Sequence, residues 1–177
     1  MQTGTRAELQ SAIERLLYYE AWLLDERRLH EWLDLFTADA TYSVGVREMV
    51  QGSEDKIAAL GPADLPLTDE DKRFLTMRVK RLETRLAHAE QPPSLTRHLI
   101  TNVLLHDEPP SEAGTGGVEL HVSSNFVVFQ TRIDIADHTF FGKRDDLLCQ
   151  VDGQWRIARR RVVVDKSPLP TVISIFF

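Results

Sequence analysis

The sequence predicts an α+β fold in which N-terminal helices pack on a strongly curved, mainly antiparallel mixed sheet. Near the start of the chain, apolar residues recur with helical spacing, whereas in the second half they alternate with polar residues in a succession of strands. Helices followed by a run of strands are typical of α+β domains. We expect a single domain over residues 1–177, because this length suffices for one hydrophobic core.

Three helices are predicted. The apolar positions between Arg6 and Leu24 follow the helical period. A second helix is expected to be capped by Asp25, with apolar positions at Leu29, Trp32, Leu33 and Phe36. A third, over residues 69–82, is expected from a Thr68–Asp71 capping box.

The strands are predicted from alternation and from turn residues. A first strand is expected from Thr41, and a later one, over residues 96–108, presents its Leu99 and Leu105 face to the core. Asp152-Gly153 lies between two strand-like runs and predicts a two-residue hairpin turn. In the strand after that turn, alternation places five residues on one face: Trp155, Ile157, Arg159, Arg161 and Val163. The apolar ending TVISIFF is expected to be paired in a sheet or buried.

Composition excludes several classes of function. The net charge is −6, which argues against nucleic acid as the main ligand. No apolar run is long enough for a membrane span and no secretory signal is evident, so we expect a cytoplasmic protein without a membrane partner. The single cysteine, Cys149, cannot form an internal disulfide, and a Rieske centre would need two cysteines. The six histidines are scattered, so no metal site is predicted.

Four segments carry a resemblance to a known family. They are LLDERRLHEWLDLF, RVKRLETRLAHAEQPPSLTRHLITNV, SSNFVVFQTR followed by FFGKRDDLL, and WRIARRRVVVDKSPLPTVISIFF. In this order they resemble the small (β) subunit of bacterial aromatic-ring-hydroxylating dioxygenases, which is related to the cone-shaped nuclear-transport-factor-2-like and scytalone-dehydratase-like folds. The segment from Gln51 to Pro66 carries none of the resemblance.

The resemblance implies a structural subunit with no catalytic residue, cofactor or metal of its own. It implies a three-plus-three assembly with a larger α subunit, which holds a Rieske 2Fe-2S cluster and a mononuclear iron, and contacts with other β subunits. The α subunit would dihydroxylate an aromatic substrate with O2 and NADH-derived electrons.

Two groups of charged residues are singled out for ion pairing. Arg78, Arg81 and Arg97 are candidates for contacts between subunits, because arginine binds carboxylates and carbonyl oxygens with several donors; the alternative is a solvated helix face. Arg159 and Arg161 are expected to pair within the chain, with Asp165, Asp145 or Asp146 as acceptors.

Two other functions stay open. His98 and Asn102 lie on one strand face and, with Tyr42, could line a pocket of a stand-alone dehydratase or isomerase that uses a His/Asp acid–base pair, for which Asp39 and His121 are further candidates. A ligand-binding cone without chemistry is the third possibility. An acid–base site requires its groups to converge, which the sequence does not show.

Overall fold

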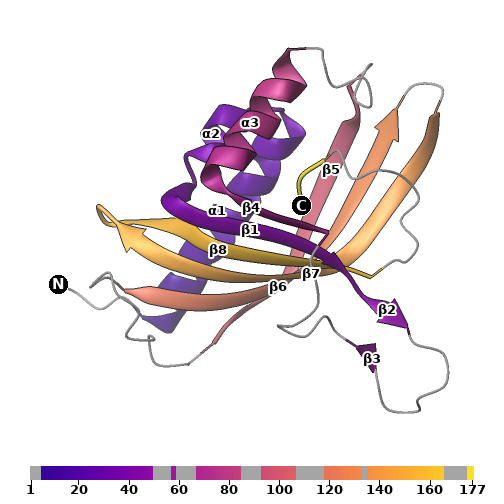
Figure 1. Cartoon of the computed structure of the whole chain (residues 1–177). Helices are drawn as coiled ribbons and strands as arrows, with labels where there is room; N and C mark the ends of the chain where they lie inside the picture. The colour runs from indigo at the N-terminus through magenta and orange to yellow at the C-terminus, as the bar shows by residue number, and fades with distance from the viewer. Residues whose placement is uncertain are drawn as a thin grey trace.

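The computed structural model describes residues 5–49, 57–58, 67–84, 93–106, 118–132, 135–165 and 175–177. Within these ranges the helices and strands come in the order α1 (Arg6–Asp25), α2 (Leu29–Leu33), β1 (Phe36–Val46), β2 (Glu48–Met49), β3 (Ile57–Ala58), β4 (Thr68–Asp71), α3 (Lys72–Glu83), β5 (Leu95–Leu105), β6 (Glu119–Arg132), β7 (Ile135–Val151) and β8 (Gln154–Val164). Figure 1 shows the three helices gathered on one side of a curved sheet.

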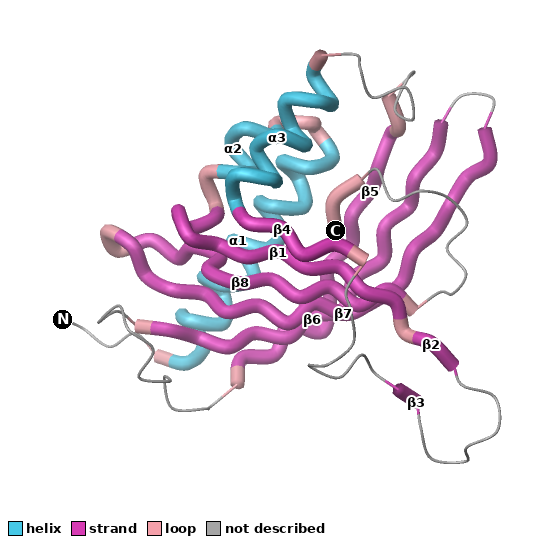
Figure 2. The backbone as a smooth tube through the Cα atoms, viewed as in Figure 1, coloured by secondary structure: helices cyan, strands magenta, loops and turns pink. Residues whose placement is uncertain are grey.

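The main sheet has six strands in the order β4-β1-β8-β7-β6-β5. β5 to β8 pair as successive antiparallel neighbours, and β1 joins β8 in parallel. The predicted mixed, mainly antiparallel sheet is thereby confirmed. The long strands bend around the helices, as the backbone trace in Figure 2 shows, and the core lies between the two layers.

The helix starts agree with the sequence only in part. α1 begins after a capping box in which the Thr5 hydroxyl accepts from the Glu8 backbone N–H and the Glu8 carboxylate accepts from the Thr5 N–H. α3 is capped by Asp71, whose carboxylate accepts from the Phe74 N–H at 2.8 Å, so the predicted Thr68 cap is wrong.

The predicted second helix is too long. α2 covers only Leu29–Leu33, and Phe36 already begins β1. Asp25 does not cap it, because Asp25 is the last residue of α1 and its carboxylate binds β5 instead.

A β-bulge in β8 changes which of its residues face the core. The pairing with β7 shifts between Leu147 and Leu148, which leaves Ala158 as an extra residue. Ile157 and Arg160 are therefore both fully buried, and the predicted unbroken alternation along this strand is wrong. The hairpin turn before the strand is confirmed, because Asp152 and Gly153 both have positive φ angles, 52° and 78°.

β5 also contains a bulge. Its register with β6 shifts between Thr101 and Leu104, and Asn102 has a φ of 53°. Before the bulge His98 and Ile100 are buried and Leu99 is exposed; after it, Leu105 is buried. The predicted core face is therefore wrong for Leu99 and correct for Leu105.

Candidate functional site

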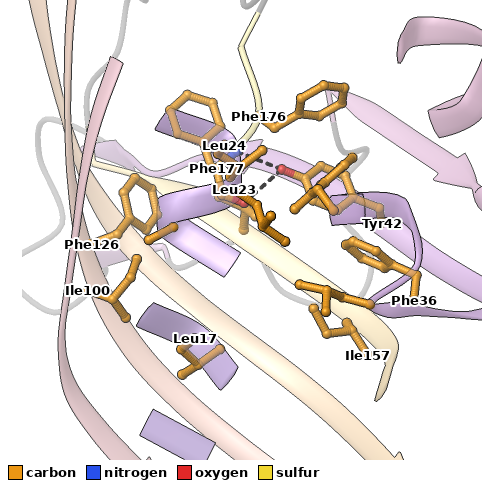
Figure 3. Packing of buried hydrophobic residues seen from close by; sticks show 14 of the residues in the cluster. Leu17, Leu23, Leu24, Phe36, Tyr42, Ile100, Phe126, Ile157, Phe176 and Phe177 are labelled. Carbon is orange, nitrogen blue, oxygen red and sulfur yellow. Dashed lines mark hydrogen bonds between the residues drawn. The ribbon is translucent and has the colours of Figure 1, made fainter. Parts of the chain in front are cut away.

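Residues 175–177 fill the mouth of the cone, where the alternative enzyme would have its pocket. Ile175, Phe176 and Phe177 are all buried, as expected for an apolar ending, whereas residues 171–174 lie outside the described residues. Figure 3 shows the Phe176 and Phe177 side chains among other buried side chains of the core, including Tyr42 and Leu24. The candidate pocket residues are best understood from their contacts with this segment.

The Tyr42 hydroxyl makes two hydrogen bonds with the backbone of Phe177. It donates to the Phe177 backbone oxygen at 2.9 Å and accepts from the Phe177 N–H at 2.9 Å (Figure 3). Tyr42 is fully buried, and burial raises the pKa of its hydroxyl, so the group is neutral near pH 7. Both hydrogen-bonding capacities of this hydroxyl are thus occupied by the chain itself.

His98 lies between a carboxylate and a backbone carbonyl. Its Nδ1 is 2.5 Å from Asp25 Oδ1, and its Nε2 is 3.1 Å from the Phe176 oxygen. Asp25 also accepts from the His98 backbone N–H at 3.1 Å, which fixes the carboxylate against β5. Because the Phe176 oxygen is an acceptor, a hydrogen bond at Nε2 requires the proton on that nitrogen, and no lone pair there is available to a substrate.

Arg78 and Trp32 enclose the Phe176 ring. The Arg78 guanidinium lies 4.4 Å from the ring centroid, and the Trp32 ring lies 4.4 Å away on a tilted plane. Arg78 also donates to the Ile175 oxygen at 3.3 Å and pairs with Glu70 at 2.7 Å. Phe177 packs between Phe126 and Phe140, with centroids 5.4 Å and 5.3 Å away.

The third predicted pocket residue does not join this group. Asn102 lies at the β5 bulge, is exposed, and accepts from the neighbouring Thr101 hydroxyl at 2.9 Å. The structure brings Tyr42 and His98 together around residues 176 and 177 and leaves Asn102 out. A cleft of about 30 Å³ lies next to them and is bordered by His98, Ile175 and Phe176.

A fully buried ion network lies deeper in the cone. Of its charged members only Asp146 has a role predicted from the sequence, as a possible acceptor for Arg159 or Arg161, and in the structure Asp146 pairs with Arg160. Glu20 binds three donors: Trp32 Nε1 at 3.0 Å, Arg144 Nη1 at 3.0 Å, and Arg160 Nη1. Arg160 also makes a two-pronged contact with Asp146, at 2.8 Å and 2.7 Å. Burial favours the neutral form of Glu20, but the charges of Arg160 and Arg144 outweigh it and lower the pKa to about 2.

The pKa values of the two arginines in this network are shifted in opposite directions. Burial alone would lower the pKa of Arg160, but Asp146 and Glu20 raise it well above the usual value. The pKa of Arg144 is lowered by burial and by the Arg160 charge. The sequence did contain a signal for this network. Glu20 lies at helical spacing in the buried row of α1 that includes Ile13, Leu17 and Leu24, so its carboxylate could have been predicted to face the core.

The other predicted site residues lie on the surface or in local ion pairs. Arg97 is 68% exposed and lies 3.6 Å from Asp25, and Arg81 is exposed on α3. Asp165 pairs with Arg47 at 3.3 Å. Arg159 and Arg161 lie on the outer face of the sheet, in a polar groove of about 660 Å³ that Asp145 also lines.

The described parts of the chain show neither a metal site nor a membrane helix. In them, no three His, Cys, Asp or Glu side chains are grouped so as to hold a metal ion. None of the helices in the same ranges is long and apolar enough to cross a membrane.

Solved structures share this fold. A structure of naphthalene 1,2-dioxygenase with indole bound in its active site contains a chain that superimposes with a TM-score of 0.79 at 21% identity, covering 99% of this chain and 89% of that chain. A scytalone dehydratase-like protein from Novosphingobium aromaticivorans has a TM-score of 0.64 at 20% identity, covering 93% and 89%. The predicted α+β cone is thereby confirmed.

Sequence relatives identify the family. The 3-phenylpropionate/cinnamic acid dioxygenase subunit beta of Photorhabdus laumondii is 32% identical over 92% of this chain and 87% of its own length. The biphenyl 2,3-dioxygenase subunit beta of Rhodococcus jostii is 32% identical over 96% and 89%. The family model "Ring hydroxylating beta subunit" matches residues 19–171. The chain therefore belongs to the family of ring-hydroxylating dioxygenase beta subunits, which pair with an alpha subunit.

Proposed function

We propose that this chain is the small, non-catalytic subunit of an aromatic-ring-hydroxylating dioxygenase. Its role is to support the α subunit that dihydroxylates an aromatic substrate with O2 and NADH-derived electrons. Family membership over residues 19–171 carries the proposal. The geometry of the cone supports it, because Tyr42 and His98 bind residues 176 and 177 of the same chain. The alternative dehydratase or isomerase would need these two groups for a substrate.

The proposed assembly has three α and three β subunits in the cytoplasm, where NADH is supplied. The Rieske 2Fe-2S cluster and the mononuclear iron belong to the α subunit in this proposal, and this chain holds no cofactor. Each β subunit contacts an α subunit and neighbouring β subunits.

We propose that the outer face of the sheet near β5 takes part in subunit contacts. Leu99, Val127 and Phe141 form one cross-strand row there, because β6 pairs with β5 and β7 at these positions. Leu99 and Phe141 are 55% and 56% exposed, so this row presents neighbouring apolar side chains to the solvent. Arg97 is opposite Phe129 in the next row, so an exposed cation borders the apolar surface. This combination is typical of protein interfaces.

Arg97 is therefore kept as a proposed interface residue, and Arg81, which is exposed on α3, stays a predicted one. Arg78 stays a prediction of the same kind, although it already contacts Glu70, Ile175 and Phe176 of its own chain. Arg159 and Arg161 stay predicted partners of acidic residues on the outer face.

The proposed function is tested by co-expression with Rieske-type α subunits. We expect this chain to co-elute with an iron-containing partner in a large complex on a sizing column, and to be iron-free when expressed alone. Failure to associate with any such α subunit, together with turnover by the isolated chain in a dehydratase or isomerase assay, would contradict the proposal.

The interface residues are tested by charge reversal. Arg97→Glu is expected to reduce the amount of complex, whereas Arg15→Glu, an exposed arginine on α1, serves as the matched control. Equal recovery of complex with both variants would remove Arg97 from the interface.

A further inference from the structure

Side chains from separate elements hold the backbone of residues 175–177, which belong to no described strand. Arg78 on α3 donates to the Ile175 oxygen, His98 on β5 faces the Phe176 oxygen, and Tyr42 on β1 binds both the N–H and the oxygen of Phe177. In a buried segment, the backbone N–H and C=O groups are ordinarily hydrogen-bonded within helices or strands. Three consecutive residues bound by side chains instead resemble a captured peptide.

The groups that bind this segment are fixed by contacts that do not involve it. Asp25 holds His98 through both the ring and the backbone, and Glu70 holds Arg78. Glu20 holds the Trp32 indole at 3.0 Å, and the Tyr42 ring lies edge-on to Trp32 and Phe36. Side chains anchored in this way keep their positions when the occupant is absent, which makes a site pre-organised.

The site also selects for aromatic rings. One ring is enclosed by Trp32 and the Arg78 guanidinium, and a second by Phe126 and Phe140. A cleft of about 30 Å³ adjoins the site and is lined by Leu24, Ser94 and Thr96 together with Phe176. The two enclosed rings belong to the consecutive residues Phe176 and Phe177, and the side chains of His98 and Tyr42 contact the backbone of the same two residues.

We propose that the mouth of the cone is a binding site for a short aromatic peptide segment, and that residues 175–177 are its resident ligand. A free peptide of the same class binds there when the resident rings are removed. The tethered segment excludes it otherwise, because a tether supplies an effective concentration on the order of millimolar. This site exists whether or not the chain joins a dioxygenase.

The test uses the full chain with Phe176→Ala and Phe177→Ala together, and the probe peptide acetyl-Ile-Phe-Phe. We expect the peptide to raise the melting temperature of the double variant and to bind it at least roughly tenfold more tightly than the wild type, whose site is occupied. Acetyl-Ile-Ala-Ala is the control peptide, and Ile13→Ala, a core-cavity variant in α1, controls for non-specific binding to a loosened protein.

A further substitution identifies the site itself. Adding Tyr42→Phe to the double variant removes only the hydroxyl and is expected to weaken peptide binding by roughly threefold or more. If the double variant does not fold alone, binding should restore its folded state, and the single variant Phe176→Ala is then measured in the same way. Equal binding to wild type and variant, no preference over acetyl-Ile-Ala-Ala, or no rescue by saturating peptide would each overturn the proposal.

Discussion

At the scale of single residues, a few buried polar side chains connect parts of the chain that are far apart in sequence. Tyr42 reaches Phe177, Asp25 reaches His98, and Glu20 joins α1 to β7 and β8. Each of them hydrogen-bonds a buried polar group that would otherwise lack a partner. An unpaired buried polar group lowers the stability of the fold by more than an ordinary hydrogen bond raises it. The stability of the cone should therefore be sensitive to changes that remove only one or two atoms.

The substitution Tyr42→Phe tests how strongly stability depends on the contact between Tyr42 and Phe177. The variant keeps the ring but leaves the Phe177 N–H and oxygen without this partner, so we expect a loss of about 1–3 kcal/mol in the free energy of unfolding. Urea denaturation measures it, with Tyr18→Phe, at an exposed tyrosine on α1, as the control. A Tyr42→Phe midpoint equal to that of the control would show that the contact contributes nothing.

Glu20 should make stability depend on pH in the acid range. Its pKa is lowered from 4.5 to about 2 in the folded state, so the folded state favours the carboxylate more strongly than the unfolded chain does. The resulting contribution, on the order of 3 kcal/mol, is fully present above about pH 4.5 and is lost as the pH falls toward 2.

The measurement is denaturation between roughly pH 6 and roughly pH 2 for the wild type and for Glu20→Gln, which has no charge to lose. This range runs from above the unfolded pKa of 4.5 down to the folded pKa of about 2. Wild-type stability is expected to fall more steeply than that of Glu20→Gln. Parallel curves would mean that Glu20 does not carry this pH dependence.

At the scale of elements, bulges and close approaches decide which face of a strand meets the core. The β8 bulge turns Arg160 inward, where Asp146 on β7 and Glu20 on α1 neutralise it. A buried arginine without such partners would be prohibitively costly. β7 and β8 therefore depend on α1 for their charge balance, which couples the helix layer to the sheet.

Gly142 on β7 allows the close approach of its neighbours. A Cβ atom at this position would lie 2.3 Å from the Val163 oxygen and 2.5 Å from the Phe126 ring. Gly142→Ala is expected to destabilise the chain by about 1–3 kcal/mol, because the backbone of β8 cannot yield easily. Thermal unfolding measures the loss, and Gly153→Asn in the exposed turn, where a positive φ suits asparagine, should change stability little. A neutral Gly142→Ala would show that the sheet can spread at this point.

At the scale of the whole molecule, the two faces of the sheet have different roles. The inner face packs on the helices and on residues 175–177, whereas the outer face presents the apolar row beside β5 and the polar groove with Arg159 and Arg161. An exposed apolar row is unfavourable for a chain on its own, which supports the proposal that subunit contacts form on this face.

Phe141→Asp tests whether the apolar row is covered in the complex. Because Phe141 is 56% exposed, we expect the isolated chain to keep its stability within roughly 0.5 kcal/mol while association with the α subunit or other β subunits decreases. Sizing chromatography of co-expressed subunits and denaturation of the chain alone give the two readings. Val118→Asp, at another exposed apolar position, is the matched control. Unchanged assembly would place the contacts elsewhere.

The fold class, the hairpin turn at Asp152-Gly153 and the family could be predicted from the sequence, because periodicity, turn residues and the segments that resemble the family can be read directly along the chain. Only the tertiary structure decided which faces of β5 and β8 are buried, since a one-residue bulge reverses every later side chain without changing the local pattern. It also decided the partners of Tyr42, His98 and Glu20. These partners lie 135, 73 and 124 residues away along the chain, for Phe177, Asp25 and Arg144 respectively, and only the closed cone brings them within hydrogen-bonding distance.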